Sequence, residues 1–242
     1  MIVLNNKGIS IVVASAKGGV GKTITTLNLA GIFEVLQKKV LIIDFDLSGG
    51  GISAALNIPN GKSSYHFAYD YNNNQYQEFK NYITKYDEYI DVLASPKDPR
   101  QAGKIDAKYV EIILDKAVFN YDVVLIDTTH DLTDFNILTL DLADFILFLV
   151  TNDPLDLKNM RSLISIFKDL DMKNYKVILN ESIFPFKDYF GIYDIKNIDT
   201  FIMNGKIITL DKRASSVFGK DYTTLMGICT DIFKEGDKHE DA

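Results

Sequence analysis

Short continuous runs of apolar and β-branched residues recur along the chain, and each run has the length of a β-strand. Because successive residues rather than alternate ones are apolar, the runs are typical of strands that are buried on both faces of a parallel sheet. The expected strands are Ile9–Ser15, Val40–Asp44, Ile90–Ala94, Val123–Asp127, Phe145–Val150 and Tyr175–Asn180.

Segments with helical spacing lie between these strands. The apolar residues that share a helix face are Ile24, Leu27, Gly31 and Val35 after the first strand, and Met160, Leu163, Ile164 and Phe167 after the fifth. Strands that alternate with helices predict right-handed βαβ units, and therefore an α/β fold with a doubly wound, mostly parallel sheet and helices on both faces. No repeat or linker divides the chain, so we expect residues 1–242 to form a single domain.

Two aromatic segments interrupt this alternation. Residues Tyr65–Tyr89 contain seven of the 13 tyrosines, and Phe184–Tyr193 is aromatic and broken by Pro185 and Gly191. Aromatic side chains mostly serve burial, so we expect both segments to pack on the edge of the sheet. The alternative is that they form a docking surface for a partner.

Composition and charge exclude several classes of protein. The 242 residues contain 26 Lys+Arg and 33 Asp+Glu, and the net charge of −7 argues against bulk electrostatic binding of nucleic acid. The single cysteine, Cys229, permits no internal disulfide and no four-cysteine zinc site. No apolar run approaches the roughly 18 residues of a membrane helix, and the first residues do not resemble a secretory signal. We therefore expect a cytoplasmic protein without a transmembrane segment.

A glycine-rich loop follows the first expected strand and precedes the first expected helix. It reads Ala16-Lys17-Gly18-Gly19-Val20-Gly21-Lys22-Thr23, with Ala16 at the position where a phosphate loop usually has its first glycine. Glycines allow backbone N–H groups to surround phosphates at the start of a helix. Lys22 is placed to bind the β and γ phosphates, and the Thr23 hydroxyl is placed to bind Mg²⁺. The strand before the loop and the helix after it supply the context of a nucleotide site.

Three carboxylates follow expected strands. Asp44 and Asp46 come at the end of the second strand and Asp127 at the end of the fourth. The carboxyl ends of parallel strands meet at one edge of a sheet, which is also the edge of the phosphate loop. Carboxylates gathered there repel one another unless a cation lies between them, so the pattern favours a bound Mg²⁺.

The string KGGVGKT resembles the deviant Walker A motif of the ParA/MinD family of P-loop ATPases. The resemblance implies a Rossmann-like P-loop NTPase fold, bound ATP and Mg²⁺, and an ATP-dependent homodimer. It implies that Lys17 reaches the nucleotide of the partner subunit and assists catalysis together with Lys22 and Asp46. The nucleotide-binding residues it implies are Gly18, Gly19, Val20, Gly21, Lys22, Thr23, Ile24 and Asn180.

The same resemblance assigns roles to the carboxylates and to one amide. Asp44 and Asp46 fall on the D-x-D switch I segment, where the second Asp orients the attacking water. Asp127 falls on the Walker B carboxylate, which holds Mg²⁺ through a water, and with Thr23 and Asp44 it forms the expected metal site. Asn180 matches an Asn that contacts the adenine.

The chain departs from the family pattern at three places. The residues after Asp127 are Thr128-Thr129-His130 in place of T-P-P or T-P-A, and Ile24 replaces a hydroxyl residue that contacts the α-phosphate. The segment expected near the adenine, Ile207–Asp211, has no proline. These differences imply a loosely held base and slow ATP hydrolysis.

Three branches of the family can be compared with the chain. MinD-like members end in a basic membrane-binding helix, whereas the apolar stripe here precedes an acidic tail and is expected to be core. The stripe consists of Tyr222, Leu225, Met226, Cys229, Ile232 and Phe233. ParA partition proteins bind nonspecific DNA, but the candidate basic residues Lys206, Lys212, Arg213 and Lys220 are few. The segment Ile90–Leu132 most resembles the CpaE/TadZ branch, which assembles Flp-type pili.

The resulting hypothesis is a dimerising MgATP-dependent switch with slow hydrolysis and an unidentified protein partner. The alternatives are a DNA-partition ATPase, a ligase of the dethiobiotin synthetase type and a nucleotide-binding scaffold without hydrolysis. Lys17 argues against the ligase, because such enzymes usually lack this lysine.

Overall fold

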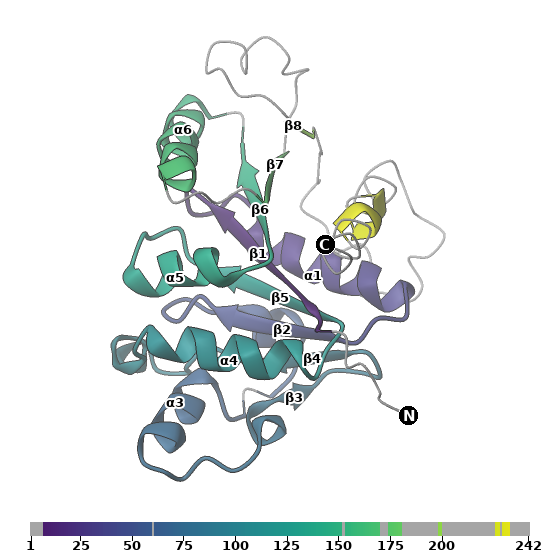
Figure 1. The fold of residues 1–242 in the computed structure, drawn as a ribbon, viewed down its shortest axis with the longest axis vertical. Helices are drawn as coiled ribbons and strands as arrows, with labels where there is room; N and C mark the ends of the chain where they lie inside the picture. Colours follow the sequence, from purple (N-terminus) through teal and green to yellow (C-terminus); the bar gives the residue numbers. More distant parts are fainter. Residues whose placement is uncertain are drawn as a thin grey trace.

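The described residues form a central sheet of eight strands, around which the helices are arranged (Figure 1). The computed structural model describes residues 7–59, 61–151, 153–169, 174–180, 198–199, 226–227 and 229–232. The strands are β1 Ile9–Ser15, β2 Val40–Phe45, β3 Thr84–Lys85, β4 Ile90–Leu93, β5 Val123–Thr128, β6 Phe145–Val150, β7 Tyr175–Leu179 and β8 Ile198–Asp199. Their order is β3-β4-β2-β5-β1-β6-β7-β8, and all neighbouring pairs are parallel except β3 with β4. The predicted doubly wound, mostly parallel sheet is confirmed, with strand ends that differ from the expected ones by at most one residue.

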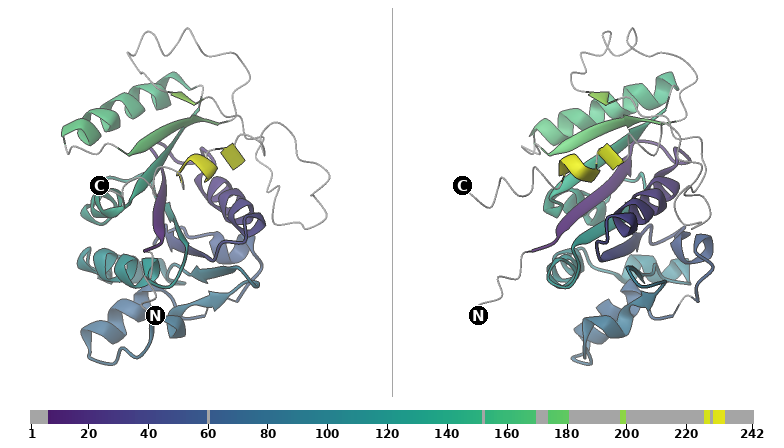
Figure 2. Two further views of the ribbon diagram at one scale, coloured as in Figure 1. Left: turned by 45° about the vertical axis from the view of Figure 1, so that its right-hand side comes forward. Right: turned by 90° about the vertical axis from the view of Figure 1, so that its right-hand side faces the viewer.

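Helices cover both faces of the sheet and form a three-layered molecule (Figure 2). The α-helices are α1 Lys22–Val35, α2 Ile52–Ala55, α3 Ser64–Asn72, α4 Lys108–Val118, α5 Asp134–Leu142 and α6 Pro154–Asp169, and two 3-10 helices are η1 Phe79–Tyr82 and η2 Pro99–Lys104. Helices α4, α5 and α6 pack on one face, and α1 packs on the other. The described residues of the C-terminal stripe join the α1 face through Cys229 and Ile232, as expected for core positions.

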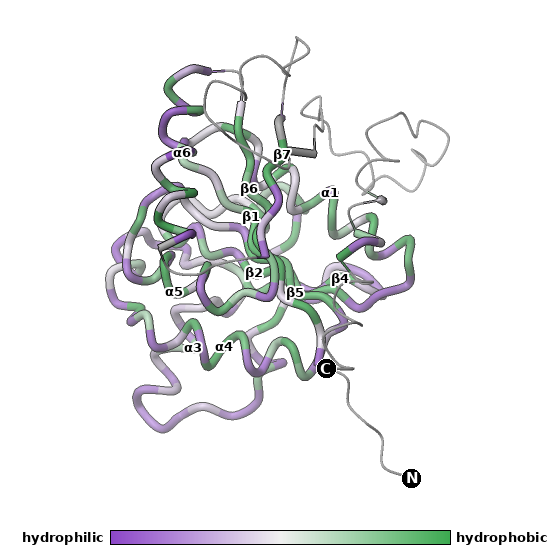
Figure 3. The backbone as a smooth tube through the Cα atoms, turned by 45° about the horizontal axis from the view of Figure 1, so that its top comes forward, coloured by the Kyte–Doolittle hydropathy of each residue, from purple (hydrophilic) through white to green (hydrophobic). Residues whose placement is uncertain are grey.

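The strands are apolar on both faces because both faces are covered. Every residue of β2, β5 and β6 is buried, and these strands form the hydrophobic centre of the molecule in Figure 3. Full burial of each aliphatic side chain contributes about 1.5–3 kcal/mol relative to an exposed one. The central strands therefore supply much of the stability that holds the sheet edge, and the residues on it, in place.

The expected helix faces are confirmed in α6 and partly wrong in α1. The four predicted residues of α6 are all buried. In α1, Leu27 and Gly31 are buried and Ile24 is partly buried, but Val35 is 52% exposed. Val35 is the last residue of α1, at the turn into β2 where Gln37 adopts a positive φ of 57°. The spacing of apolar residues in the sequence included Val35, because spacing does not show where the helix stops packing against the sheet.

The tyrosine-rich segment forms a small aromatic lobe at the β4 edge of the sheet, made of α3, η1 and β3. Phe67 is its centre, with Tyr76 and Tyr82 rings at centroid distances of 5.5 Å and 5.3 Å in edge-to-face contact. Phe67 and Tyr82 belong to the main core, so the packing interpretation is confirmed for this segment. The second aromatic segment, residues 184–193, lies outside the described residues.

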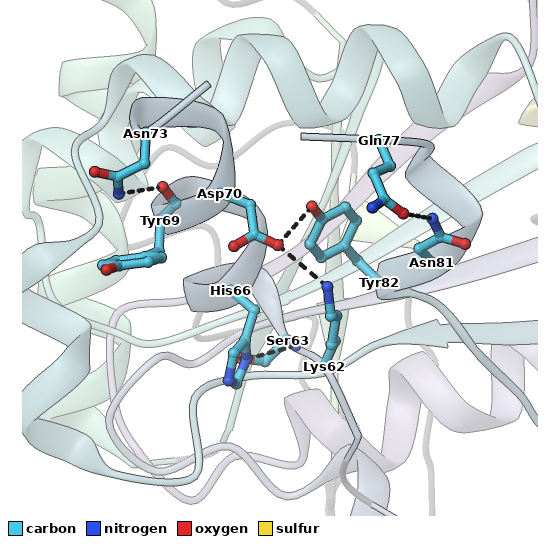
Figure 4. A network of polar contacts seen from close by, with 9 residues as sticks. All are labelled: Lys62, Ser63, His66, Tyr69, Asp70, Asn73, Gln77, Asn81 and Tyr82. Carbon is cyan, nitrogen blue, oxygen red and sulfur yellow. Dashed lines mark hydrogen bonds and ion pairs between the residues drawn. The ribbon is translucent and has the colours of Figure 1, made fainter. Parts of the chain in front are cut away.

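Polar contacts tie α3 to η1 across this lobe (Figure 4). One oxygen of Asp70 accepts hydrogen bonds from the Tyr82 hydroxyl at 2.8 Å and from the Lys62 ammonium at 3.1 Å. The Lys62 nitrogen also lies 4.7 Å from the centroid of the Tyr82 ring. Burial and the neighbouring Asp70 raise the pKa of Tyr82 to about 12, which keeps its hydroxyl a donor over the physiological range.

We expect Tyr82→Phe to lower the free energy of unfolding by about 1 kcal/mol, because one buried hydrogen bond is lost while Asp70 keeps Lys62 as a partner. Urea denaturation measures the change. Tyr69→Phe is the matched control, since Tyr69 lies on the same lobe and is 53% exposed. Equal stability losses in the two variants would contradict the proposed role of the Tyr82 hydroxyl.

Candidate functional site

Polar side chains gather where the parallel strands end. The residues at or just beyond the carboxyl ends are Ser15 of β1, Asp44 and Asp46 of β2, Ser95 after β4, Asp127 of β5, Asp153 after β6 and Asn180 after β7. Strand β1 lies between β5 and β6, so the loop that leaves it has polar neighbours on both sides. This position, where the chain winds outward in both directions, is where open α/β sheets bind ligands.

The glycine-rich loop has the backbone conformation that its glycines permit. Gly19 and Gly21 have φ angles of 77° and 93°, in the left-handed region that favours glycine. A Cβ added to Gly21 would lie 2.5 Å from the side-chain nitrogen of Asn180. That nitrogen donates a hydrogen bond of 2.7 Å to the Val20 carbonyl, while the Asn180 backbone N–H donates to Val150 at 2.8 Å. Asn180 therefore fastens the loop to the ends of β6 and β7.

Lys22 and Thr23 begin α1 and point back toward the strand ends. The buried Lys22 ammonium donates to the Ser15 hydroxyl at 3.0 Å. Burial lowers the pKa of Lys22, and the negative charges of Asp127 and Asp46 oppose that shift. The Thr23 hydroxyl donates to one oxygen of Asp127 at 2.6 Å. A cation and a hydroxyl are thus held beside a carboxylate at the start of a helix, as phosphate and metal binding require.

Asp44 and Asp127 form a pair of buried carboxylates on adjacent strands. They are register partners in β2 and β5, and each is 1% exposed. Burial and the charge of Asp127 raise the pKa of Asp44 to about 8, and burial raises the pKa of Asp127 to about 6. Asp44 accepts hydrogen bonds on Oδ2 from the Ile52 N–H and the Ser95 hydroxyl, at 3.2 Å and 3.3 Å.

The second oxygen of each carboxylate is suited to bind a cation. Oδ1 of Asp44 and Oδ1 of Asp127 are buried without a hydrogen-bond partner among the described residues. Buried carboxylate oxygens are costly unless they are paired, and oxygen ligands are the ones that Mg²⁺ prefers. Within the described part of the chain, no three His, Cys, Asp or Glu residues form a closed metal cage. The two unpartnered carboxylate oxygens and the Thr23 hydroxyl fit a Mg²⁺ ion that takes its other ligands from water and phosphate.

The backbone at Gly50 lies very close to the side chains of Ser95 and Asp44. A Cβ added to Gly50 would lie 1.8 Å from the Ser95 hydroxyl oxygen and 2.7 Å from Oδ2 of Asp44. A side chain at residue 50 would displace the groups that hold Asp44. The turn after β2 therefore needs glycine at this position for steric reasons.

Asp46 lies two residues beyond Asp44 and is only partly buried. Its Oδ1 accepts a hydrogen bond of 2.9 Å from the Gly49 N–H, which holds the side chain in the turn after β2. Its charge acts on Lys22, Asp44 and Asp127, so it belongs to the same cluster. Unlike the buried pair, it is open to solvent, where a water molecule can approach it.

Lys17 lies at the opposite end of the glycine-rich loop from Lys22 and forms an ion pair with Asp153. Its ammonium is 2.5 Å from Oδ2 of Asp153, and both side chains are about 40% exposed (41% and 39%). The hydrogen bond to Asp153 raises the pKa of Lys17, and the same bond lowers the pKa of Asp153. Oδ1 of Asp153 accepts the Leu155 N–H at 2.8 Å, so this carboxylate also caps the start of α6.

The structure brings together most of the predicted residues but gives two of them additional roles. Ile24 packs against the core beneath α1, and the Asn180 amide binds the loop backbone. Sequence reasoning missed Ser15, Ser95 and Asp153, although each follows a strand end as Asp44 and Asp127 do. The candidate DNA-binding residues and the segment 207–211 lie outside the described residues.

A left-handed glycine loop, a buried lysine, a helix-start threonine and a strand-end carboxylate define a P-loop nucleotide-binding site. The AAA_31 family model, described as an AAA domain, matches residues 8–180, and the chain belongs to this family. An uncharacterised ATP-binding protein of Methanocaldococcus jannaschii is 30% identical over 141 residues. This match covers 58% of the chain and 52% of that protein, so the chain spans about half the length of this relative.

Solved structures of ParA and MinD proteins share the fold. A ParA family ATPase from Chlorobium tepidum has a TM-score of 0.78 at 15% identity, over 93% of this chain and 98% of that one. The septum site-determining protein MinD of Pyrococcus horikoshii, complexed with Mg-ADP, has a TM-score of 0.75 at 18% identity, over 93% and 96% of the two chains. Among the residues that the structure describes, no helix combines the length and apolar character needed to cross a bilayer.

We expect Asp44→Asn to raise the melting temperature of the nucleotide-free, Mg²⁺-free protein by at least about 4 °C at pH 8. The folded pKa of about 8 exceeds the ordinary value of 3.8, so stability falls as pH rises between these two values. Asn stays neutral and avoids this loss. At pH 5 most of this loss of wild-type stability has not yet developed. The rise in melting temperature caused by Asp44→Asn should therefore shrink to about a third of its value at pH 8.

Thermal unfolding at the two pH values measures this difference. Asp46→Asn is the control for removing one negative charge from the partly exposed part of the same turn. A gain in Asp44→Asn that does not change with pH would contradict the assignment of the loss to burial of a titrating carboxylate.

Proposed function

We propose that the protein is an ATP-dependent molecular switch that dimerises around two Mg-nucleotides and hydrolyses ATP slowly. The observation that carries this proposal is the placement of Lys17. The buried Lys22 ammonium, 3.0 Å from the Ser15 hydroxyl, is placed to bind the phosphates of its own subunit. Lys17 projects from the other side of the loop into a partly exposed position, where a second subunit can approach it.

Different residues of one subunit bind the phosphates and the metal of MgATP. The N–H groups of Gly18–Thr23 surround the phosphates, Lys22 neutralises their β and γ oxygens, and Thr23 with Asp127 holds the metal side. Bound Mg²⁺ would neutralise the γ-phosphate and the buried carboxylates together. The unpartnered oxygens of Asp44 and Asp127 support this assignment.

Slow turnover follows from the groups that are present around the phosphates. Asp46 is the partly exposed carboxylate of the cluster, and we assign it the orientation of the attacking water. Ile24 offers the α-phosphate no hydroxyl and packs in the core instead. A switch that holds ATP long enough to act on a partner needs only such slow hydrolysis.

We further propose a protein partner of the pilus or secretion type, with the switch acting in the cytoplasm, where ATP is available. The resemblance of Ile90–Leu132 to the CpaE/TadZ branch supports this partner, and the net charge of −7 disfavours DNA. A gel shift with nonspecific DNA, in ATP and in ADP, tests the partition alternative directly.

The dimer is tested by light scattering of Asp46→Ala, which should bind ATP without hydrolysing it. In ATP we expect twice the 27.3 kDa of one chain, and in ADP a single chain. Adding Lys17→Ala should return the ATP sample to the monomer, because the attraction between its ammonium and the opposite nucleotide is lost. Its affinity for ATP as a monomer should change little.

Lys22→Ala is the control that removes ATP binding itself and should remain monomeric under all conditions. Two results would count against the switch. The first is an Asp46→Ala protein that stays monomeric in saturating ATP. The second is an ATP-dependent dimer that persists without Lys17, in which case a nucleotide-binding scaffold becomes the better description.

The Lys17–Asp153 ion pair opposes dimerisation, because Lys17 must leave Asp153 to reach a second subunit. Each dimer breaks two such pairs, so we expect Asp153→Asn to raise the ATP-dependent dimer association constant about threefold or more. Asn retains the capping oxygen for the Leu155 N–H, which keeps α6 intact. Glu78→Gln breaks an exposed ion pair, Glu78–Lys80 at 2.6 Å, in the aromatic lobe away from this edge and is the control. Sedimentation at several protein concentrations gives the constants, and equal values for the two variants would exclude the effect.

A further inference from the structure

His130 lies against the phosphate loop, although it comes from a different part of the chain. It belongs to the loop between β5 and α5, three residues after Asp127. A Cβ added to Gly18 would lie 3.4 Å from Cε1 and 3.5 Å from Nδ1 of His130. The imidazole therefore occupies the space beside the first glycine of the loop, while its side chain remains 50% exposed.

The segment that carries His130 is tied down on both sides. The side-chain nitrogen of Asn136, a buried residue of α5, donates to the Thr129 hydroxyl at 3.1 Å and to the Asp131 carbonyl at 2.7 Å. One residue earlier, the Thr128 hydroxyl donates to the Val13 carbonyl of β1 at 3.0 Å. The backbone before and after His130 is thus anchored to β1 and α5, and its ring is presented to the loop by a fixed scaffold.

The position of His130 relative to the metal side of the site indicates what it can reach. Asp127, with the Thr23 hydroxyl, would hold the cation, which would neutralise the charge of the terminal phosphates. The loop of His130 continues from the same strand end, on the β5 side of β1. Asn180 lies on the other side of β1, at the end of β7. His130 therefore lies toward the terminal phosphates.

We propose that His130 donates a hydrogen bond to the γ-phosphate of bound ATP, and that this contact makes the site prefer ATP over ADP. The proposal rests on the proposed nucleotide binding and adds a residue to it. An imidazole carries at least one N–H whatever its protonation state, so the donor is always present. Asn136 is the positioning residue, because it holds the two neighbours of His130 through hydrogen bonds.

A purely structural role for His130 makes a different prediction. If the ring only covers Gly18, its removal should loosen the loop and weaken ATP and ADP alike, because the loop holds the phosphates that both nucleotides share. A contact to the γ-phosphate should weaken only the triphosphate. The ratio of the two affinities separates these roles.

The experiment is isothermal titration of the full chain with Mg-AMPPNP, a triphosphate analogue that is not hydrolysed, and with Mg-ADP. We expect His130→Ala to weaken AMPPNP binding about tenfold or more, as for one hydrogen bond to a charged group, and ADP binding less than twofold. His130→Gln keeps an N–H donor and should recover most of the preference. Leu132→Ala, a similarly exposed residue of the same loop, is the control and should change neither affinity.

Asn136→Ala provides a second, independent readout through the positioning of the loop. It should reduce the AMPPNP preference in the same direction as His130→Ala, and in the double variant the losses should not add, since both act through one contact. Because Asn136 is buried, the fold of this variant is checked by thermal unfolding, while the exposed His130 variants test the proposal by themselves.

Two results would overturn the assignment of His130. One is that neither affinity changes in His130→Ala, and the other is that the affinities for AMPPNP and ADP fall by the same factor. A wild-type protein that binds neither nucleotide would instead overturn the proposed function, and the assignment of His130 with it.

Discussion

The burial of two carboxylates side by side is the constraint on which the site depends. Asp44 and Asp127 stand in register at the ends of two central strands, covered on both faces, and each keeps one oxygen without a partner among the described residues. In isolation this pair is unfavourable, as the raised pKa of both groups indicates. A bound cation with phosphates would compensate the two buried negative charges. Binding of such a ligand would therefore stabilise the folded protein.

The other polar groups of the site differ in how deeply they are buried around this pair. Lys22 is buried beside it, whereas Lys17 remains near the surface in an ion pair with Asp153. Asp46 is partly exposed at the turn that follows β2, and His130 is half-exposed at the loop that follows β5. Exposed groups of this kind can change partners when a ligand binds, because their present interactions contribute little free energy and water can replace them.

The sequence predicted the layered α/β fold, because continuous apolar runs have few uses other than strands covered on both sides. It also predicted which strand ends bear the carboxylates, since parallel strands place their carboxyl ends on one edge. It could not predict that Val35 is exposed, because spacing does not show where α1 leaves the sheet. Nor did it single out Ser15, Ser95 or Asp153, since a single polar residue after a strand has many ordinary uses.

By itself, then, the sequence determined the elements, the edge on which the site lies and the chemistry of its loop, because these follow from local pattern and from the spacing of glycine, lysine and threonine. Only the tertiary structure decided which groups meet. The strand order brought Asp44 next to Asp127, the turn after β6 gave Lys17 a partner in Asp153, and the anchored loop after β5 placed His130 beside Gly18. These contacts join residues up to 136 positions apart, so they depend on how the whole sheet is wound and not on any local preference.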